Sequence, residues 1–329
     1  MASATGKKAG HIGRDHSHLQ WSKHNPPVVT VSSGEVVTFD AIDSSNGQIS
    51  RSSNASAITT FDTGLANPVF GPVYVQDAKP GDVLKVEVMD LQIGDWGWTA
   101  IIPGFGLLAD EFPTPVLHVW EDLDQTRGYT SFKGEENIRI PLRPFLGCMG
   151  VAPGTDDGLS TIPPTDAGGN IDCRDLTVGS VVYLPVFADG ALFSCGDGHA
   201  TQGHGEVCGT AIETPMKATL RFEVCKNKSW VTAPHYEIPP SSSGRSRPLA
   251  AVPDRGRHAV MGVDPDIMEA SRKAVRNTLR WLMDTKGLRR EEAYMLASVV
   301  GDLQIVEAVN IPNYIVAMSI PLGIFGSTA

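Results

Sequence analysis

The sequence lacks several features that would place the protein in a common functional class. No stretch approaches the roughly 20 apolar residues that a membrane-spanning helix needs, and residues 1–16 lack the apolar segment of a signal peptide. We therefore expect no membrane anchor. Neither a P-loop nor a GxGxxG pattern occurs, so nothing supports nucleotide binding. Basic residues are fewer than acidic ones, 27 against 37, and the net charge of −10 argues against nucleic acid as a partner.

Cysteine is also scarce. The five cysteines are an odd number in a long chain, and no two of them form a CxxC pair. This pattern is typical of reduced thiols rather than of a disulfide framework. We therefore predict a cytoplasmic protein. The cysteines are Cys148, Cys173, Cys195, Cys208 and Cys225.

Three stretches share one pattern, in which a glycine-containing turn precedes a run rich in β-branched residues. They are SSGEVVTFDAID at 32–43, KPGDVLKVEVMD at 79–90 and TVGSVVYLPVFA at 177–188. The glycine supplies the positive φ of the turn, and the run that follows pairs into a sheet. The pattern predicts a mainly β body with a sandwich-like or barrel-like architecture over residues 1–225.

The C-terminal part has a different pattern, with apolar residues at helical spacing. Asp264 and Pro265 are expected to begin the first helix, and Gly287 to end it. The predicted elements are helices over 266–286 and 290–300 and strands near 302–309 and 314–320. Residues 226–262, rich in Pro, Ser and Arg, are expected to be a linker or long loop. Residues 263–329 then form a smaller α/β subdomain, and the chain is α+β overall.

Residues 192–213, LFSCGDGHATQGHGEVCGTAIE, carry the strongest functional signal. Four potential metal ligands fall within ten positions, among glycines that let the backbone turn sharply. They are Asp197, His199, His204 and Glu206. Residues two apart on an extended segment share a face, so each i, i+2 pair can converge. A tight turn near 201–202 would place the two pairs opposite each other.

Imidazole and carboxylate groups in one small site suit zinc or a similar divalent cation. With three protein ligands and one open position, such a cation can activate water. The alternative interpretation is a glycine-rich surface hairpin with scattered polar residues. Two ligand pairs in one segment favour the metal site, although the spacing is not that of HExxH.

The run GDGHATQGHGEVCGTAIE resembles the signature segment of the acetamidase/formamidase family. Further blocks resemble that family in the expected order, so the resemblance covers most of the chain. These blocks are PPVVTVSSGEVVTFDAIDSSNGQI at 26–49, WGWTAIIPGFGLLADEF at 96–112, PFLGCMGVAP at 144–153 and GGNIDCRDLTVGSVVYLPV at 168–186.

The resemblance implies a metal-associated hydrolase of short aliphatic amides that forms homo-oligomers, with a β-rich fold and a smaller α/β portion near the C-terminus. It also favours a site role for Asp172, although the preceding GGN turn fits an Asx turn or cap equally well. The expected metal ligands are Asp172, Asp197, His199 and Glu206, with zinc as the expected metal and calcium as the alternative. Many relatives carry Asp where this chain has His204.

Glu206 is the expected general base, which takes a proton from water and then protonates the departing amine. His204 is the second catalytic candidate. Two other hypotheses stay open. One is a non-catalytic β-sandwich module that binds a small ligand and holds a structural metal. The other is a thiol-dependent amidase that uses Cys208, with His204 or Glu206 as its base.

Five residues are candidates for contact with a small amide. His18 lies in a segment that resembles the family's stretch before its first strand. Asp43 and Gln48 match another family block, and they either orient substrate or form turn hydrogen bonds. Trp98 is either a core residue or one wall of an apolar pocket. Cys208 directly follows the motif, where it is either a substrate contact or a small buried residue on a strand.

Overall fold

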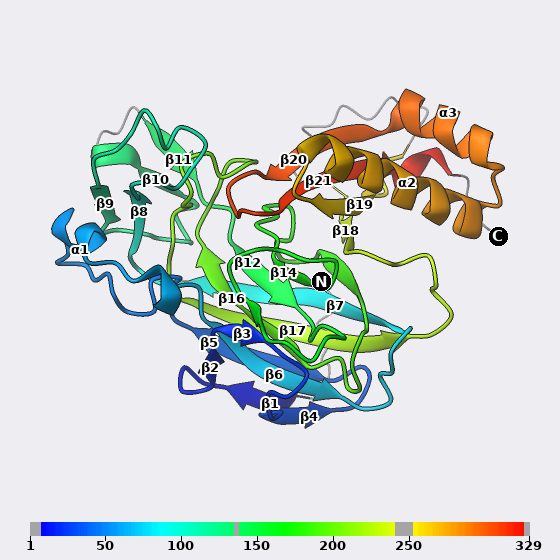
Figure 1. Ribbon diagram of the computed structural model, residues 1–329, viewed down its shortest axis with the longest axis horizontal. Coiled ribbons are helices and arrows are strands. Elements are labelled where there is room, and N and C mark those ends of the chain that lie inside the picture. Colours follow the sequence, from blue (N-terminus) through cyan, green and yellow to red (C-terminus); the bar gives the residue numbers. More distant parts are fainter. Residues whose placement is uncertain (1–7, 135–137, 241–252, 326–329) are drawn as a thin grey trace.

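The computed structural model describes residues 8–134, 138–240 and 253–325 (Figure 1). Strands form most of the regular structure, and two longer helices lie together at one end (Figure 1). The prediction of a mainly β chain with a few helices is therefore confirmed. Within these ranges, no helix is long and apolar enough to cross a membrane.

The largest sheet has nine strands and connects the body to the C-terminal part. Its neighbours are antiparallel except for the first pair, β1 and β5. In sheet order, the strands are β1 (Lys8–Ile12), β5 (Val36–Ala41), β17 (Met216–Cys225), β7 (Val83–Ile93), β15 (Val181–Pro185), β18 (His235–Ile238), β19 (Arg257–Asp264), β21 (Tyr314–Pro321) and β20 (Asp302–Glu307).

The three predicted turn–strand units all belong to this sheet, as β5, β7 and β15. The glycines before them are Gly34, Gly81 and Gly179, with φ of +93°, +92° and +88°. Residues with a Cβ rarely adopt this conformation, so glycine sets the turn from which each strand begins. The turn chemistry and the strands inferred from the sequence are thus confirmed.

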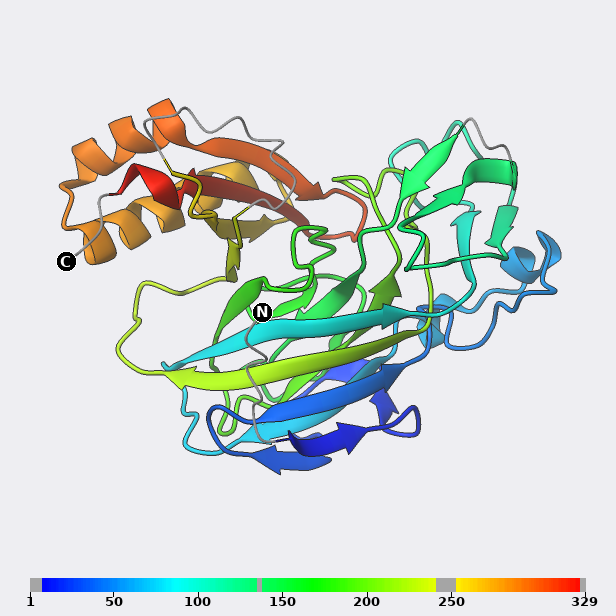
Figure 2. The ribbon, with the colours of Figure 1, turned by 180° about the vertical axis from the view of Figure 1, so that it is seen from behind.

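A second sheet of six strands packs against the first. Phe193 of the second sheet contacts Phe39 and Phe222 of the first, with ring centroids 6.3 and 5.1 Å apart. One buried apolar cluster holds side chains from both sheets, and Figure 2 shows the two layers from behind. Neither sheet closes into a barrel within the described residues. The strands are β14 (Gly168–Asn170), β12 (Phe145–Gly150), β16 (Phe193–His199), β6 (Val69–Val75) and β2 (Ser17–His18), with β4 (Val29–Val31) paired to β6.

Short elements lie on the loops around these sheets. Three are strand pairs: β8 (Gly97–Ile101) with β9 (Val116–Trp120), β10 (Tyr129–Ser131) with β11 (Arg139–Pro141), and β3 (Gln20–Trp21) with β13 (Leu159–Ser160). The helical turns are α1 (Ser56–Thr59), η1 (Thr63–Leu65), η2 (Phe132–Gly134) and η3 (Leu322–Ile324). The β8–β9 pair and α1 stand at the end of the molecule away from the longer helices (Figure 1).

Both predicted C-terminal helices are present, as α2 (Ile267–Lys286) and α3 (Arg290–Val300). They cover one face of the sheet at β19 and β21 (Figures 1 and 2). Gly287 ends α2 with φ of +66°, as expected. The predicted start is wrong by two positions. Asp266 is the N-cap and accepts a hydrogen bond from the Glu269 N–H at 2.9 Å, whereas Asp264 belongs to β19.

The stretch 226–262 departs from the long loop that its composition suggested, because β18 and β19 lie within it. Tyr236 on β18 is fully buried, and this strand pairs with β15 on one side and with β19 on the other. The sheet therefore continues from the body into the C-terminal part. With only four residues, β18 is too short for an alternation of apolar and polar residues to be recognised in the sequence. Residues 241–252, the centre of the Pro/Ser/Arg-rich stretch, lie outside the described residues.

Candidate active site

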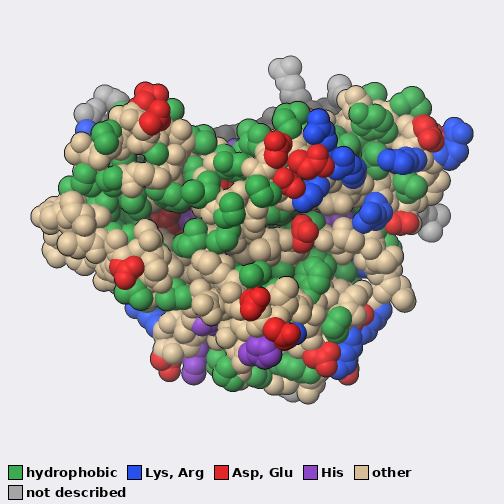
Figure 3. Space-filling model, in the orientation of Figure 1, with side chains coloured by type: hydrophobic (Ala, Val, Ile, Leu, Met, Phe, Trp, Pro, Cys, Tyr) green, Lys and Arg blue, Asp and Glu red, His purple; other side chains and the backbone are tan. Residues whose placement is uncertain are grey.

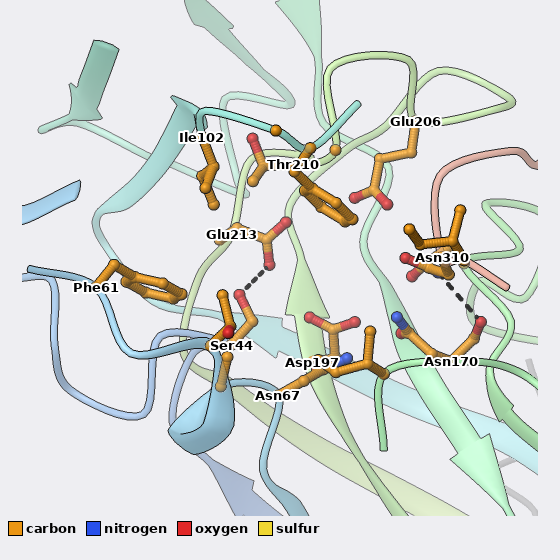
Figure 4. A pocket seen from close by; sticks show the side chains of 18 of the residues that line it. Ser44, Phe61, Asn67, Ile102, Asn170, Asp197, Glu206, Thr210, Glu213 and Asn310 are labelled. Carbon is orange, nitrogen blue, oxygen red and sulfur yellow. Dashed lines mark hydrogen bonds between the residues drawn. The ribbon is translucent and has the colours of Figure 1, made fainter. Parts of the chain in front are cut away.

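A cavity of ≈ 420 Å³ opens where loops from both sheets and from the C-terminal part meet. One wall is acidic and the other is largely apolar, as the close view shows (Figure 4). On the surface, acidic and histidine side chains are visible deep in a hollow between hydrophobic ones (Figure 3). The cavity therefore combines buried charge with access from solvent.

Five ionisable side chains converge on the acidic wall, each at most 6% exposed. The Nε2 atom of His199 lies 3.1 Å from Asp197 Oδ1 and 3.2 Å from Glu213 Oε2. The Glu206 Oε1 atom is 4.0 Å from the same nitrogen. On the other side of the ring, the Nδ1 atom lies 3.9 Å from Asp172 Oδ1. His199 is thus the centre of a cluster of four carboxylates.

The pairing of β12 with β16 makes room for two of these carboxylates. Asp197 and His199 lie on β16, and the neighbouring strand β12 carries Gly147. A Cβ atom at position 147 would collide with the carboxylates of Asp172 and Asp197. Glycine is therefore needed here for the space that its missing side chain leaves.

Three of the four carboxylates stand on strained backbone. Asp172, Asp197 and Glu206 have φ of +40°, +58° and +46°. Residues with a Cβ adopt the left-handed region rarely, and such positions concentrate at functional sites. The backbone geometry and the buried charge thus indicate the same site independently.

The predicted tight turn near 201–202 is wrong. His199 pairs with Glu213, and the Ala200 N–H donates to the Ile212 carbonyl at 2.9 Å, so a longer loop over 200–212 closes the segment. This pairing brings Glu213 to the imidazole. The sequence reasoning missed Glu213, although it is the last residue of the run that resembles the family signature.

His204 does not line this cavity, and its catalytic role stays a prediction. Its Nε2 atom lies 3.8 Å from Asp175 Oδ2, and it lines a neighbouring cleft that also includes Glu206. Glu206 does line the cavity. The 200–212 loop is not an extended strand, so the i, i+2 rule does not decide on which side each of these side chains lies.

The C-terminal segment supplies a residue that the sequence reasoning missed. Asn310 lines the cavity and donates a hydrogen bond from Nδ2 to Asp172 Oδ2 at 2.5 Å. The N–H groups of Val309 and Asn310 both donate to the buried carboxylate of Glu307. Asp172 is thus held by a loop that lies 138 positions further along the chain. No local pattern in the sequence indicated this contact.

Trp98 lines the cavity, as one interpretation of the sequence predicted. Its indole N–H donates to the carboxylate of Asp43 at 2.9 Å, so Asp43 holds the tryptophan rather than lining the cavity. Gln48 forms two hydrogen bonds with the backbone of Asp62, at 3.0 and 2.8 Å. Gln48 therefore braces the loop that carries Phe61 to the cavity, which is the turn role considered for it.

His18 and Cys208 do not line the cavity themselves. His18 forms hydrogen bonds with the Ser194 hydroxyl at 2.9 Å and the Gln20 carbonyl at 2.8 Å. The Cys208 thiol lies 3.4 Å from the Thr210 carbonyl, beside a second, apolar pocket. Neither residue is placed to contact a ligand in the cavity. All five cysteines are unpaired, as expected.

The cluster holds more acidic groups than can ionise together in a buried site. Burial raises the pKa of Asp197 to about 7, and burial followed by the charge of Asp172 raises the pKa of Glu206 well above its usual value. Burial would also lower the pKa of His199, but the charges of Glu213 and Asp197 outweigh it and raise this pKa strongly. The acidic wall therefore favours a positive charge at its centre.

The donor set fits a divalent cation. Asp172, Asp197 and His199 offer three ligand atoms within 4.8 Å of one another, and so do His199, Glu206 and Glu213. Asp172 Oδ1 and His199 Nδ1 are buried and have no hydrogen-bond partner. Buried polar atoms are nearly always satisfied, so two orphaned atoms that face each other mark a place for a ligand.

Comparisons with known proteins agree with this geometry. The model of the acetamidase/formamidase family matches residues 7–157 and 154–327. A formamidase of Methylophilus methylotrophus is 25% identical over 94% of this chain and 89% of its own. An acetamidase of Mycolicibacterium smegmatis is 27% identical over 60% of this chain and 63% of its own. The crystal structure of an acetamidase from Bacillus halodurans superposes with a TM-score of 0.84 at 28% identity, covering 95% of this chain and 97% of that one.

The fold and the site thus define an enzyme class, the amidohydrolases that act on linear amides. The family model covers nearly the whole described chain, from the first strand to the last. This protein belongs to the acetamidase/formamidase family.

Proposed function

We propose that this protein hydrolyses small linear amides to ammonia and a carboxylate, with a divalent cation bound at the His199 cluster. The observation that carries the proposal is the group of four buried carboxylates around one imidazole, at the wall of a cavity. Burying so many acids is costly unless a cation neutralises them. Membership of the family supports an amide as the substrate.

Asp172, Asp197 and His199 are the proposed ligands, because two of the three carry the orphaned atoms. The Nε2 atom of His199 faces Glu213 at 3.2 Å. A proton on Nε2, donated to that carboxylate, leaves the Nδ1 lone pair free for a metal. An imidazole among carboxylates suits zinc better than calcium, which takes about six to eight oxygen ligands.

A divalent cation at this place would supply a positive charge that polarises the amide carbonyl and makes a water more acidic. Glu206 is the proposed proton carrier, because its carboxylate lines the cavity beside these ligands. It takes a proton from the attacking water and gives one to the amide nitrogen, since without that proton the leaving group would be an amide anion, which leaves poorly. Asn310 holds the carboxylate of Asp172 in place during these steps.

The thiol mechanism has less support. Cys208 lies between the apolar pocket and the cleft that includes His204 and Glu206, but its thiol has Thr210 rather than either base as its hydrogen-bond partner. A cysteine nucleophile needs a base within hydrogen-bond reach. Cys208→Ala should therefore keep amidase activity.

The test combines elemental analysis of the purified protein with ammonia release from formamide, acetamide and propionamide. We expect a divalent metal in the wild type, loss of activity with a chelator, and loss of both metal and activity in His199→Ala. His24→Ala is the control and should retain both, because His24 is exposed and does not line the cavity. A folded His199→Ala protein with full activity would refute the proposed centre, and a metal without any amidase activity would favour a binding module.

The predicted homo-oligomer and cytoplasmic location stay predictions. Size-exclusion chromatography with light scattering would test the first of them directly.

A further inference from the structure

The cavity is much larger than a formamide or acetamide molecule requires. Its volume is ≈ 420 Å³, whereas one water occupies ~30 Å³ in the liquid, so the space corresponds to about fourteen waters. A cation, one water and the amide group would fill only the end next to His199. A substantial part of the cavity is left for another portion of the substrate.

This remaining part has an apolar wall of side chains that pack against each other. Phe61 and Ile102 lie on the side of the cavity away from Glu206 and Asn310 (Figure 4). Phe61 packs against Trp98 with ring centroids 6.4 Å apart, and the hydrogen bond to Asp43 fixes the indole. The apolar wall thus has a defined shape before any substrate binds.

The two ends of the cavity differ in the chemistry that they can accept. Carboxylates and an imidazole meet the amide end, whereas Phe61 and Ile102 lie at the other end, where the polar neighbours are uncharged side chains such as those of Ser44 and Thr210 (Figure 4). A charged group placed there would lose its hydration without gaining an ionic partner at the apolar wall. An apolar group placed there would gain the free energy of burial.

We propose that the preferred substrate is a primary amide whose acyl group carries an uncharged apolar arm of about phenyl size, such as phenylacetamide. This inference rests on the proposed function and assigns its substrate class. Hydrolysis breaks the C–N bond, and water supplies the hydroxyl to the acyl carbon and a proton to the nitrogen. The products are ammonia and an apolar carboxylic acid such as phenylacetic acid, whose proton passes to ammonia at neutral pH to give phenylacetate and ammonium.

The experiment compares kcat/KM for acetamide, hexanamide, phenylacetamide and 5-aminopentanamide. Full burial of a phenyl-sized group corresponds to a gain of roughly 10- to 100-fold, so we expect phenylacetamide and hexanamide to exceed acetamide by that factor. 5-Aminopentanamide has the length of hexanamide but ends in an ammonium group, and it should show no such gain.

Phe61→Ala removes part of the apolar wall and should lower the phenylacetamide-to-acetamide ratio of kcat/KM by about tenfold. Ile102→Ala should lower it in the same direction and serves if the first variant does not fold. Leu65→Ala is the matched control, because Leu65 lies on the same loop, is 48% exposed and is not part of the cavity wall. Its ratio should equal that of the wild type.

Isothermal titration with the product acids gives a readout other than turnover. Phenylacetate should bind about tenfold or more tightly than acetate, and Phe61→Ala should reduce this difference. Equal or better hydrolysis of acetamide than of phenylacetamide, or equal binding of the two acids, overturns the inference and leaves the proposed function intact. Absence of hydrolysis of every amide by the metal-loaded protein overturns both.

Discussion

Glu206 and Glu213 both face His199, yet the two carboxylates have different partners. Glu213 accepts hydrogen bonds from the Ser44 hydroxyl at 2.7 Å and the Ala211 N–H at 2.8 Å. Burial alone would raise its pKa, but the charge of His199 and these hydrogen bonds lower it. Glu206 has a raised pKa, caused by burial and the charge of Asp172. At the scale of single residues, Glu213 is therefore suited to hold the imidazole, and Glu206 to carry a proton.

We predict that Glu206→Gln lowers kcat by about 10²- to 10⁴-fold, because the amide side chain cannot exchange a proton with water or with the leaving amine. Ammonia release under saturating substrate measures the effect. Glu111→Gln changes an exposed acid and should leave kcat unchanged. Wild-type turnover by a folded, metal-loaded Glu206→Gln protein would exclude Glu206 as the proton carrier.

A second prediction at this scale concerns Gly147. An alanine there would force the carboxylates of Asp172 and Asp197 to move. Overpacking of a filled interior costs about 1–3 kcal/mol in the free energy of unfolding, so we expect a loss of that size together with a loss of bound metal. Urea denaturation and elemental analysis measure the two effects. Gly203→Ala is the control, because a Cβ there meets no atom within 4 Å; similar behaviour of the two variants would contradict the proposed crowding.

At the scale of elements, α2 attaches the helical layer to the sheet. Its buried face includes Ala270, Ala274 and Leu282, which share one apolar cluster with Val316 and Ile320 of β21. The small alanines permit close approach of the helix to the sheet, and Gly262 of β19 lies directly beneath the helix backbone. The helix is therefore positioned by its packing against the sheet, whereas its ends are set by local capping.

We predict that Asp266→Ala lowers the free energy of unfolding by about 0.5–2 kcal/mol, because the N–H of Glu269 loses its acceptor. Thermal and urea denaturation at neutral pH provide the measurement. Asp284→Ala removes an exposed acid near the opposite end of the same helix, where a negative charge is unfavourable, and should not destabilise. Equal losses in both variants would show that charge, not capping, decides the effect.

At the scale of the whole molecule, two buried histidines connect the body sheet to the helical layer. The Nδ1 atom of His235 on β18 lies 3.2 Å from the Nε2 atom of His258 on β19. The His258 ring stacks on Trp281 of α2, with ring centroids 4.1 Å apart. Burial, followed by the charge of the neighbouring histidine, lowers the pKa of His235 well below its usual value. Burial also lowers the pKa of His258, against the raising effect of Glu237. The folded protein therefore holds both rings neutral.

This arrangement predicts a loss of stability in mild acid. Above pH 6.5, which is about the pKa of a histidine in the unfolded chain, neither the folded nor the unfolded protein binds the proton. The contribution of the neutral histidines to the free energy of unfolding is then fully present. As the pH falls below that value the unfolded chain takes up protons that the folded chain does not, so the free energy of unfolding falls. We expect His235→Leu to flatten the pH dependence by up to about 1.4 kcal/mol per pH unit. Urea denaturation between neutral pH and mild acid, with the exposed His24→Leu as control, measures this slope; parallel curves for His235→Leu and the wild type would refute it.

The sequence by itself determined the features that depend on neighbouring residues. The positive-φ glycines before β5, β7 and β15, the helices α2 and α3, and the shared face of Asp197 and His199 on β16 all follow from local backbone geometry and side-chain periodicity. The resemblance to the family signature located the same two site residues. These features were predictable because each depends on a few consecutive positions.

Only the tertiary structure decided which distant residues complete the site. Glu213 reaches His199 through strand-like pairing across the 200–212 loop, and Asn310 reaches Asp172 across 138 positions. His204, which the local pattern paired with Glu206, lies beside Asp175 instead. Such contacts depend on the register of the sheets and on how loops pack, and periodicity along the chain carries no information about either. The cavity and its apolar wall exist for the same reason, because they form only where segments from separate parts of the chain meet.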